Sequence, residues 1–152
     1  MIENRSVPAD GLLAHVFYED VAAAIAWLSK TFGFVEHYRY GVSAEGTVSG
    51  AQMHLGSAWV MLLGMREGRS TPAKIGCGTQ ILTVFVEDVE GHFERAKAEG
   101  ATIVEEPRET GYGELQYAAL DLDGHHWLFS KHVRDVAPEE WGAVVSPDFK
   151  GL

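Results

Sequence analysis

The sequence has only one cysteine, Cys77, which excludes an internal disulfide framework. Basic residues are also few, because 12 lysines and arginines stand against 22 aspartates and glutamates, giving a formal net charge of −10. Nucleic acids and anionic membrane surfaces bind to basic protein faces, so this charge argues against both as partners. No apolar run approaches the roughly 18 residues of a membrane-spanning helix, and no signal peptide is recognisable. We therefore expect a soluble, cytoplasmic protein.

Several motifs of common enzyme classes are missing as well. The chain contains no Gly-x-Ser-x-Gly element, no Walker-type phosphate loop, no dinucleotide-binding fingerprint and no Cys-x-x-Cys pair. Hydrophobic residues make up 46% of the 152 residues, which is enough to build a core without disulfide bonds. Length and composition predict one globular domain over residues 1–152.

What the sequence does contain is an internal repeat. Val16–Val21 reads VFYEDV and Val84–Val89 reads VFVEDV, so that Asp20 and Asp88 are 68 residues apart. A Gly-x-x-Trp-x-apolar frame occurs twice at the same offset, with its tryptophans at Trp59 and Trp127. Two anchors in one register indicate an internal duplication.

Each half has the pattern of a strand, a helix and three further strands. Asp20 and Asp88 are predicted N-caps, because an aspartate side chain can accept the free N–H groups of a first helical turn. Periodicity and turn residues place the strands at 12–18, 34–40, 47–55, 58–63, 79–86, 102–105, 115–122 and 126–131. The predicted modules span about 11–65 and 79–131, with a linker at 66–78 and a C-terminal tail at 132–152.

These elements predict an α+β fold of two tandem βαβββ modules. In each module the helix covers one face of the sheet, and the other face must be buried by something else. Two modules side by side can bring their bare faces together as one curved mixed sheet around a cleft. The repeat is therefore expected to build a pocket with two walls.

The order of short motifs resembles the vicinal oxygen chelate superfamily. The motifs are Glu19-Asp20-Val21, Phe32-Gly33-Phe34, Glu99-Gly100-Ala101-Thr102, Tyr112-Gly113-Glu114 and Asp121-Leu122-Asp123-Gly124-His125-His126-Trp127. This superfamily includes glyoxalase I, extradiol dioxygenases, fosfomycin-resistance enzymes and bleomycin-resistance drug-binding proteins. The resemblance covers roughly residues 12–131 and implies the βαβββ fold, but it says little about the reaction, since one fold hosts many chemistries.

In the metal-using members, His, Gln or Glu side chains from the first and last strand of each module bind one divalent ion. The matching positions here are Leu13, Val60, Ile81 and Leu128. Aliphatic side chains offer no lone pair to a metal. We therefore expect no metal and no cofactor at the family position. A shift of two residues would keep the strand face and bring in His15, Thr83 or Ser130, so a divalent metal stays open as the alternative.

Alternation along the strands predicts which side chains line the cleft. Val60 and Leu62 are expected on its wall, whereas Trp59, Met61, Trp127 and Phe129 are expected beneath the helices. Tyr112, between two glycines, is a candidate rim residue that closes over a ligand, and Tyr117 is expected on the same wall. The complete predicted ligand-binding set is His15, Phe17, Thr83, Phe85, Tyr112, Tyr117, His126, Leu128 and Ser130.

Two functions follow from this expectation. The first is a metal-free protein that sequesters a small aromatic or amphipathic molecule, as bleomycin-resistance proteins do, and its acidic balance favours a cationic ligand. The second is a lyase, isomerase or dioxygenase that uses a divalent metal or His15 as a general base. The resemblance also implies a homodimer, because family members often complete their clefts at a subunit interface.

Overall fold

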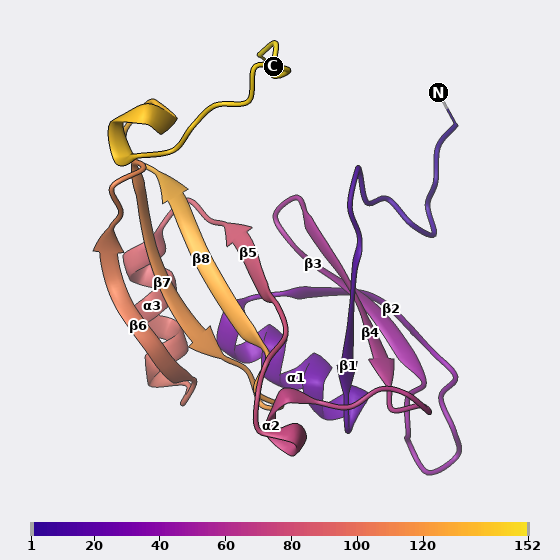
Figure 1. The fold of residues 1–152 in the computed structure, drawn as a ribbon. Coiled ribbons are helices and arrows are strands. Elements are labelled where there is room, and N and C mark those ends of the chain that lie inside the picture. The colour runs from indigo at the N-terminus through magenta and orange to yellow at the C-terminus, as the bar shows by residue number, and fades with distance from the viewer. Residues whose placement is uncertain (1, 152) are drawn as a thin grey trace.

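The computed structural model describes residues 2–151, and within them the chain forms two βαβββ modules joined by a short linker (Figure 1). The first module comprises β1 (Ala14–Tyr18), α1 (Val21–Phe32), β2 (Val35–Tyr40), β3 (Gly50–Leu55) and β4 (Ala58–Gly64). The linker carries α2 (Pro72–Ile75), and the second module comprises β5 (Ile81–Phe85), α3 (Val89–Ala98), β6 (Thr102–Glu109), β7 (Glu114–Leu120) and β8 (His126–His132). A 3₁₀ turn at Pro138–Trp141 lies in the tail. The predicted α+β class and module order are confirmed.

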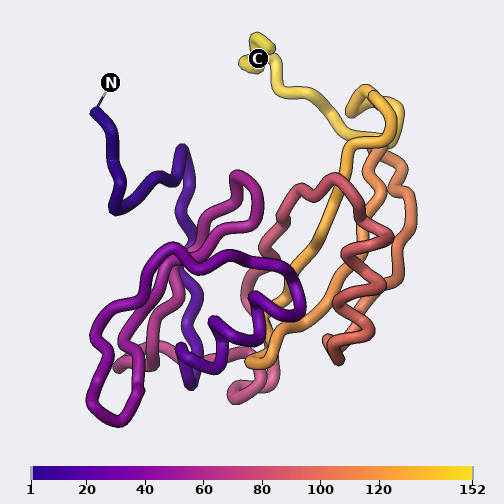
Figure 2. The backbone as a smooth tube through the Cα atoms, turned by 180° about the vertical axis from the view of Figure 1, so that it is seen from behind, coloured from indigo at the N-terminus to yellow at the C-terminus, as the bar shows by residue number. Residues whose placement is uncertain are grey.

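Each module builds its own mixed sheet of four strands. The strand orders are β1-β4-β3-β2 and β5-β8-β7-β6, with the first strand of each module parallel to the last. Helices α1 and α3 lie on the same side of the molecule, as Figure 2 shows from behind, and they contact each other. Each sheet therefore has one face under a helix and one open face. No helix within residues 2–151 has both the length and the apolar character needed to cross a membrane.

The two long helices begin at the predicted aspartates. The carboxylate of Asp20 accepts the N–H of Ala23 at 3.0 Å, and that of Asp88 accepts the N–H of Gly91 at 2.9 Å. Gly33 ends α1 with a φ of 81°, a left-handed conformation that favours glycine. A Cβ at Gly33 would also lie 3.0 Å from the guanidinium of Arg95. Module two thus approaches the end of α1 closely.

The hydrophobic core is shared between the modules. The ring of Phe32, at the end of α1, lies 4.8 Å from the ring of Phe129 and 6.1 Å from that of Trp127 in β8. Phe34 meets Trp127 edge-on at 5.4 Å, and all four rings are fully or almost fully buried. Aromatic pairs of this kind add about 0.5–1.5 kcal/mol each beyond their buried area. The first module therefore completes the core of the second.

A buried carboxylate joins the modules at one end of this core. Asp121 accepts the hydroxyl of Tyr18 at 2.7 Å and the indole N–H of Trp127 at 3.0 Å through one oxygen. Its other oxygen accepts the backbone N–H groups of Asp123 and His125, both at 3.0 Å. Burial, followed by the adjacent Asp121 carboxylate, raises the pKa of Tyr18 well above its usual value, so that the phenol remains a donor.

The turn between β7 and β8 adds two further bonds at the same end. The imidazole Nε2 of His125 lies 2.6 Å from the backbone oxygen of Phe17, and the carboxylate of Asp123 accepts the N–H of Glu19 at 2.9 Å. Burial raises the pKa of Asp123, against the effect of the hydrogen bond from Glu19, which lowers it. The turn of the second module is therefore bound to the strand end of the first.

At the other end of the core, α3 supplies donors to the last carbonyls of α1. Arg95 donates to the backbone oxygens of Ser29 at 2.9 Å and Lys30 at 3.0 Å. The Nε2 of His92 lies 2.7 Å from the backbone oxygen of Phe32. A helix leaves its last carbonyls without partners inside the helix, and here the other module donates to three carbonyls of the last turn, of which that of Ser29 also accepts the N–H of Gly33.

The repeat is out of register by one residue in the last strand of the first module. His15 pairs with Met61 across β1 and β4, whereas Thr83, its counterpart, pairs with Leu128 across β5 and β8. Met61, rather than Val60, is therefore the counterpart of Leu128. A shift of one residue moves every side chain of a strand to the other face.

This shift overturns the predicted faces of β4. Val60 and Leu62 are buried in the core, and Trp59 and Met61 lie on the open face. The second module follows the prediction, because Trp127 and Phe129 are buried under the helices. The two tryptophans of the repeated motif thus have opposite surroundings.

Replacing Asp121 by asparagine tests the polar link between the modules. An amide oxygen and an NH₂ group cannot accept all four hydrogen bonds, so at least one buried donor loses its partner. We expect a loss of about 2 kcal/mol or more in the free energy of unfolding, measured by urea denaturation with an unchanged m-value. The control is Glu36→Gln, which removes an exposed ion pair with Arg39 and should cost less than about 1 kcal/mol. Equal effects of the two changes would contradict the importance of this link.

Candidate functional site

The open face of the first sheet carries a cluster of aromatic side chains. The indole of Trp59 stacks on the imidazole of His54 with ring centroids 4.5 Å apart and planes 27° apart. His37 meets Trp59 edge-on at 5.6 Å, and Tyr38 lies beside His37 at 4.9 Å. We call these four residues the aromatic patch. Its members come from β2, β3 and β4, whose pairing brings them together on one face.

A buried glutamine supports the aromatic patch from the centre of the sheet. Gln52 is fully buried, and its side-chain oxygen lies 2.7 Å from Nδ1 of His37. Its NH₂ group donates to the sulfur of Met61 at 3.4 Å, and the hydroxyl of Tyr38 reaches the same sulfur at 3.8 Å. Because the glutamine oxygen is an acceptor, the hydrogen of His37 is placed on Nδ1. These bonds fix the orientation of the imidazole of His37 and the phenol ring of Tyr38.

The open face of the second sheet carries most of the predicted ligand-binding residues. Thr83 and Phe85 lie on the open face of β5, on either side of the buried Val84. The residues of β8 that pair with Thr83 and Phe85 lie on the same face. The predicted residues on this face are Thr83, Phe85, His126, Leu128 and Ser130. His15 and Phe17 lie instead on the open face of the first sheet.

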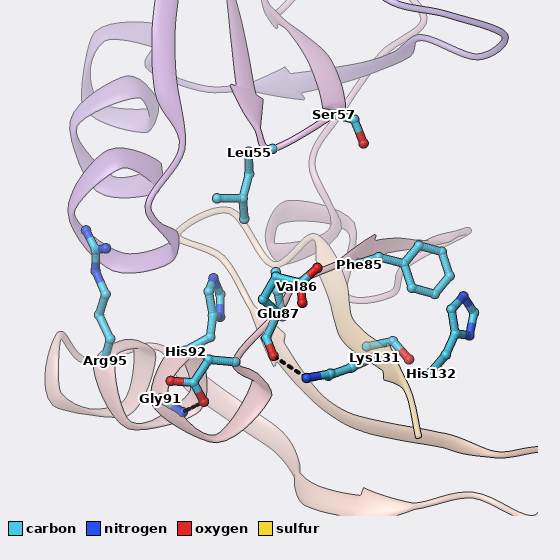
Figure 3. A pocket seen from close by; sticks show the side chains of 13 residues that line it. Leu55, Ser57, Phe85, Val86, Glu87, Gly91, His92, Arg95, Lys131 and His132 are labelled. Atoms are coloured by element: carbon cyan, nitrogen blue, oxygen red, sulfur yellow. Dashed lines mark hydrogen bonds between the residues drawn. The ribbon is translucent and has the colours of Figure 1, made fainter. Parts of the chain in front are cut away.

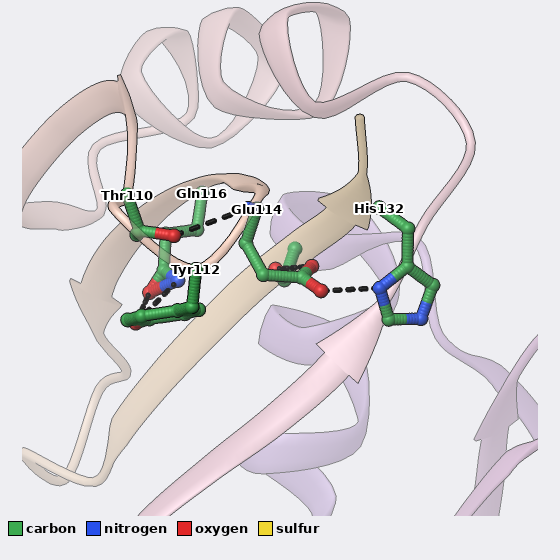
Figure 4. A network of polar contacts seen from close by, with 6 residues as sticks. Thr110, Tyr112, Glu114, Gln116 and His132 are labelled. Carbon is green, nitrogen blue, oxygen red and sulfur yellow. Dashed lines mark hydrogen bonds and ion pairs between the residues drawn. The ribbon is translucent and has the colours of Figure 1, made fainter. Parts of the chain in front are cut away.

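A polar network lies at the end of this second face (Figure 4). Glu114 accepts the hydroxyl of Ser130 at 2.7 Å with one oxygen and pairs with Nδ1 of His132 through the other. Glu114 is largely buried and His132 largely exposed, so the imidazole is held by one nitrogen while its Nε2 is left open to solvent. The ring of His132 lies 4.9 Å from that of Phe85.

Tyr112 occupies the edge of the same region. Its side chain is 45% exposed, its hydroxyl accepts from the amide of Gln116 at 3.1 Å, and its ring meets Trp141 of the tail edge-on at 5.7 Å. The ring of Tyr112 is therefore half-exposed and packs against the tail, and its role as a rim residue stays a prediction.

Tyr117 does not line the open face, and the prediction for this residue is wrong. It is fully buried, its ring stacks on Phe129 at 5.3 Å, and its hydroxyl bonds to Nδ1 of His92. Successive residues of a strand point to opposite faces, and in β7 it is Gln116 and Ala118 that pair with open-face residues of β8. Burial raises the pKa of Tyr117.

Several cavities adjoin the open faces, and two of them bear on the candidate site. The larger, about 760 Å³, lies between the β3–β4 turn at residues 55–57 and the second module. Figure 3 shows His92 and Arg95 on one side of it and Phe85 and His132 on the other. The smaller, about 570 Å³, has His15, Phe17 and Leu63 on one wall and the linker on the other.

The residues at the family's metal positions do not fit a divalent metal. Leu13, Ile81 and Leu128 carry no donor atom, and the thioether of Met61 is a soft donor already engaged by Gln52 and Tyr38. His15 is exposed on the wall of the smaller cavity, and within residues 2–151 it has no hydrogen-bond partner. Over the same residues no three His, Cys, Asp or Glu side chains converge as metal ligands.

Comparison with known proteins agrees with this architecture. The sequence profile of the Glyoxalase/Bleomycin resistance protein/Dioxygenase superfamily matches residues 12–129. The chain belongs to this superfamily. An uncharacterized protein of Mycobacterium bovis, also similar to this chain, is 31% identical over 145 residues, covering 92% of this chain and 95% of that protein.

Two solved structures of the superfamily's fold extend the comparison. TioX from Micromonospora sp. ML1 is 32% identical, covers 82% of this chain and 100% of its own, and superimposes with a TM-score of 0.68. A glyoxalase/bleomycin resistance protein/dioxygenase family enzyme from Burkholderia phytofirmans PsJN is 18% identical, covers 80% of this chain and 97% of its own, and has a TM-score of 0.59. At that identity the second likeness concerns the fold alone.

His92 predicts a pH dependence of stability for this superfamily member. Its burial between α1 and β7 lowers the pKa of the imidazole below its usual value near 6.5. The unfolded chain therefore takes up a proton first, and the free energy of unfolding should fall as the pH drops below about 6.5. His92→Gln can keep the donor to Phe32 and cannot titrate, so we expect a flatter dependence in urea denaturation between about pH 7.5 and about pH 5.5. His126→Gln serves as the control, and an equally steep slope in wild type and His92→Gln would contradict this role.

Proposed function

We propose that the protein binds a small, aromatic or amphipathic molecule at its open sheet faces without a metal, and so sequesters it. The observation that carries this proposal is the aromatic patch on the first sheet, held in place by Gln52 and Met61. The apolar residues at the four family metal positions agree with it. Membership of a superfamily that includes bleomycin resistance proteins makes binding without turnover a natural use of the fold.

The patch suits a flat ligand for physical reasons. Trp59 and His54 already stack on each other, and Trp59 remains partly exposed. A planar ring placed against the indole gains stacking of about 0.5–1.5 kcal/mol beyond the apolar area that it buries. The Nε2 atoms of His37 and His54 have no hydrogen-bond partner within residues 2–151, so they can supply directed hydrogen bonds to a ligand, as a few polar groups do in most small-molecule sites.

We further propose that the functional unit is a homodimer. Each of the two cavities uses the open face of one sheet only. In β5, Ile81 is 56% exposed and Phe85 is 59% exposed, both on the open face of the second sheet. A second copy that covers this face would bury them and close the cavity from the side that is now open.

An enzymatic role is the second candidate, and one observation favours it. Glu114 holds Nδ1 of His132 and leaves Nε2 of that ring open beside Phe85 and the larger cavity. An imidazole oriented by a carboxylate is suited to accept a proton. His15, the base expected from the sequence, has no such partner within residues 2–151. Under this alternative, His132 is the better candidate for the base.

The binding proposal is tested with a neutral aromatic probe, N-phenyl-1-naphthylamine, titrated by fluorescence. We expect saturable binding to the wild type and at least about tenfold weaker binding to the Trp59→Ala/His54→Ala double variant, because each lost stacking partner contributes about 1 kcal/mol. Phe149→Ala removes an exposed aromatic ring from the tail and is the matched control. Unchanged affinity in the double variant would contradict the proposal that the aromatic patch binds the ligand.

Metal analysis of protein purified without chelator separates the two candidates. A metal-free binding protein should contain far less than one divalent ion per chain. A stoichiometric ion that is lost on replacing His15 by alanine would favour the enzymatic role over metal-free binding.

A further inference from the structure

Two arginines of the linker converge on one aromatic ring. Directly after β4, the guanidinium carbons of Arg66 and Arg69 lie 5.5 and 5.4 Å from the centre of the Phe17 ring. Phe17 belongs to β1 and projects from the open face of the first sheet. The ring attracts both cations through its negative face. Two positive charges are thereby held at the same place despite their mutual repulsion.

Neither arginine has an acidic partner within residues 2–151. The side-chain hydrogen bond of Arg69 goes to the backbone oxygen of neighbouring Gly68 at 3.2 Å. By contrast, Arg39, Arg108 and Arg134 each pair with a glutamate. In a chain with 22 acidic and 12 basic residues, two adjacent arginines without a carboxylate are unexpected. Apart from that bond, the side-chain donors of both arginines have no partner within residues 2–151 and remain free for an external anion.

These arginines line the smaller cavity, of about 570 Å³. Phe17 and Leu63 give it an apolar wall, and Ser70 and Gln80 add polar groups from the linker side. His125 also lies on this wall, but its Nε2 is already bonded to the backbone oxygen of Phe17. The cavity therefore offers a flat apolar surface beside two planar guanidinium groups, a combination that matches a ring bearing a carboxylate or sulfonate.

We propose that this cavity is a subsite for the anionic group of a planar organic acid, with the acid group held by Arg66 and Arg69 and the ring against Phe17 and Leu63. The subsite rests on the proposed binding of a small aromatic molecule and names its chemical class. It reverses the sequence-based expectation of a cationic ligand. Net charge acts over long distances and is screened within about 8 Å at physiological salt, so the two nearby arginines decide which charge binds here.

The test compares 1-naphthoate with the neutral 1-naphthalenemethanol, each titrated while amide signals are followed by ¹H–¹⁵N NMR. We expect both ligands to shift the signals of Phe17 and Leu63, with naphthoate binding at least about tenfold more tightly. In the Arg66→Gln/Arg69→Gln variant, naphthoate should weaken about tenfold while the alcohol changes less than about twofold. Arg5→Gln/Arg108→Gln removes the same total charge elsewhere and should leave the preference intact.

The outcomes separate the subsite from the proposed function. Equal affinity for the two ligands, or a naphthoate preference that survives Arg66→Gln/Arg69→Gln, would overturn the anionic subsite and leave binding of aromatic molecules standing. Naphthoate shifts that map only to the second module would overturn it too. If neither ligand shifts any signal of the open faces, both the subsite and the proposed function fail. All four substituted arginines are exposed, so the variants are expected to fold.

Discussion

The carboxylate of Asp121 is the interaction on which the rest of the structure depends. It gathers the phenol of Tyr18 from the first module and the indole of Trp127 from the second, and its own turn supplies two backbone donors. The bond from Tyr18 is the one of the four that crosses between the modules, so the phenol and the carboxylate would both lose it if the modules separated. At the opposite end of the core, His92 and Arg95 satisfy carbonyls of α1 in the same way. The aromatic core between these two links can be buried only while both modules are docked.

Docking through the helix side determines which face of each sheet stays accessible. The side chains under α1 and α3 are buried in the shared core, and the opposite face of each sheet stays open. On the first sheet this face carries the aromatic patch and the ring of Phe17. On the second sheet it ends in the network of Glu114, Ser130 and His132. The two faces thus differ in chemistry although the modules share one plan, and the linker adds the arginines that give one cavity a positive charge.

The fold could be predicted from the sequence because its signals are local. The repeated E-D-V elements mark strand ends and helix caps, and the aspartates do cap the helices. The matching tryptophans suggested the wrong face for β4, since motif spacing does not reveal a one-residue shift in strand pairing. The strand predicted at 102–105 is longer in the structure, where β6 continues to Glu109, because an edge strand tolerates a proline, here Pro107, beside its irregular pairing. The contacts of Asp121, of His92 and of the arginine pair at Phe17 join residues far apart in the sequence. No local sequence pattern predicts such contacts.

The most direct test of the shared core is native-state hydrogen exchange at increasing, low concentrations of denaturant. If the modules are stable only when docked, the slowest amides of β3 and β4 and those of β7 and β8 should exchange with one common free energy of opening, equal to that of global unfolding. A first or second module whose strands open as a separate unit, at clearly lower free energy than the other, would contradict the account.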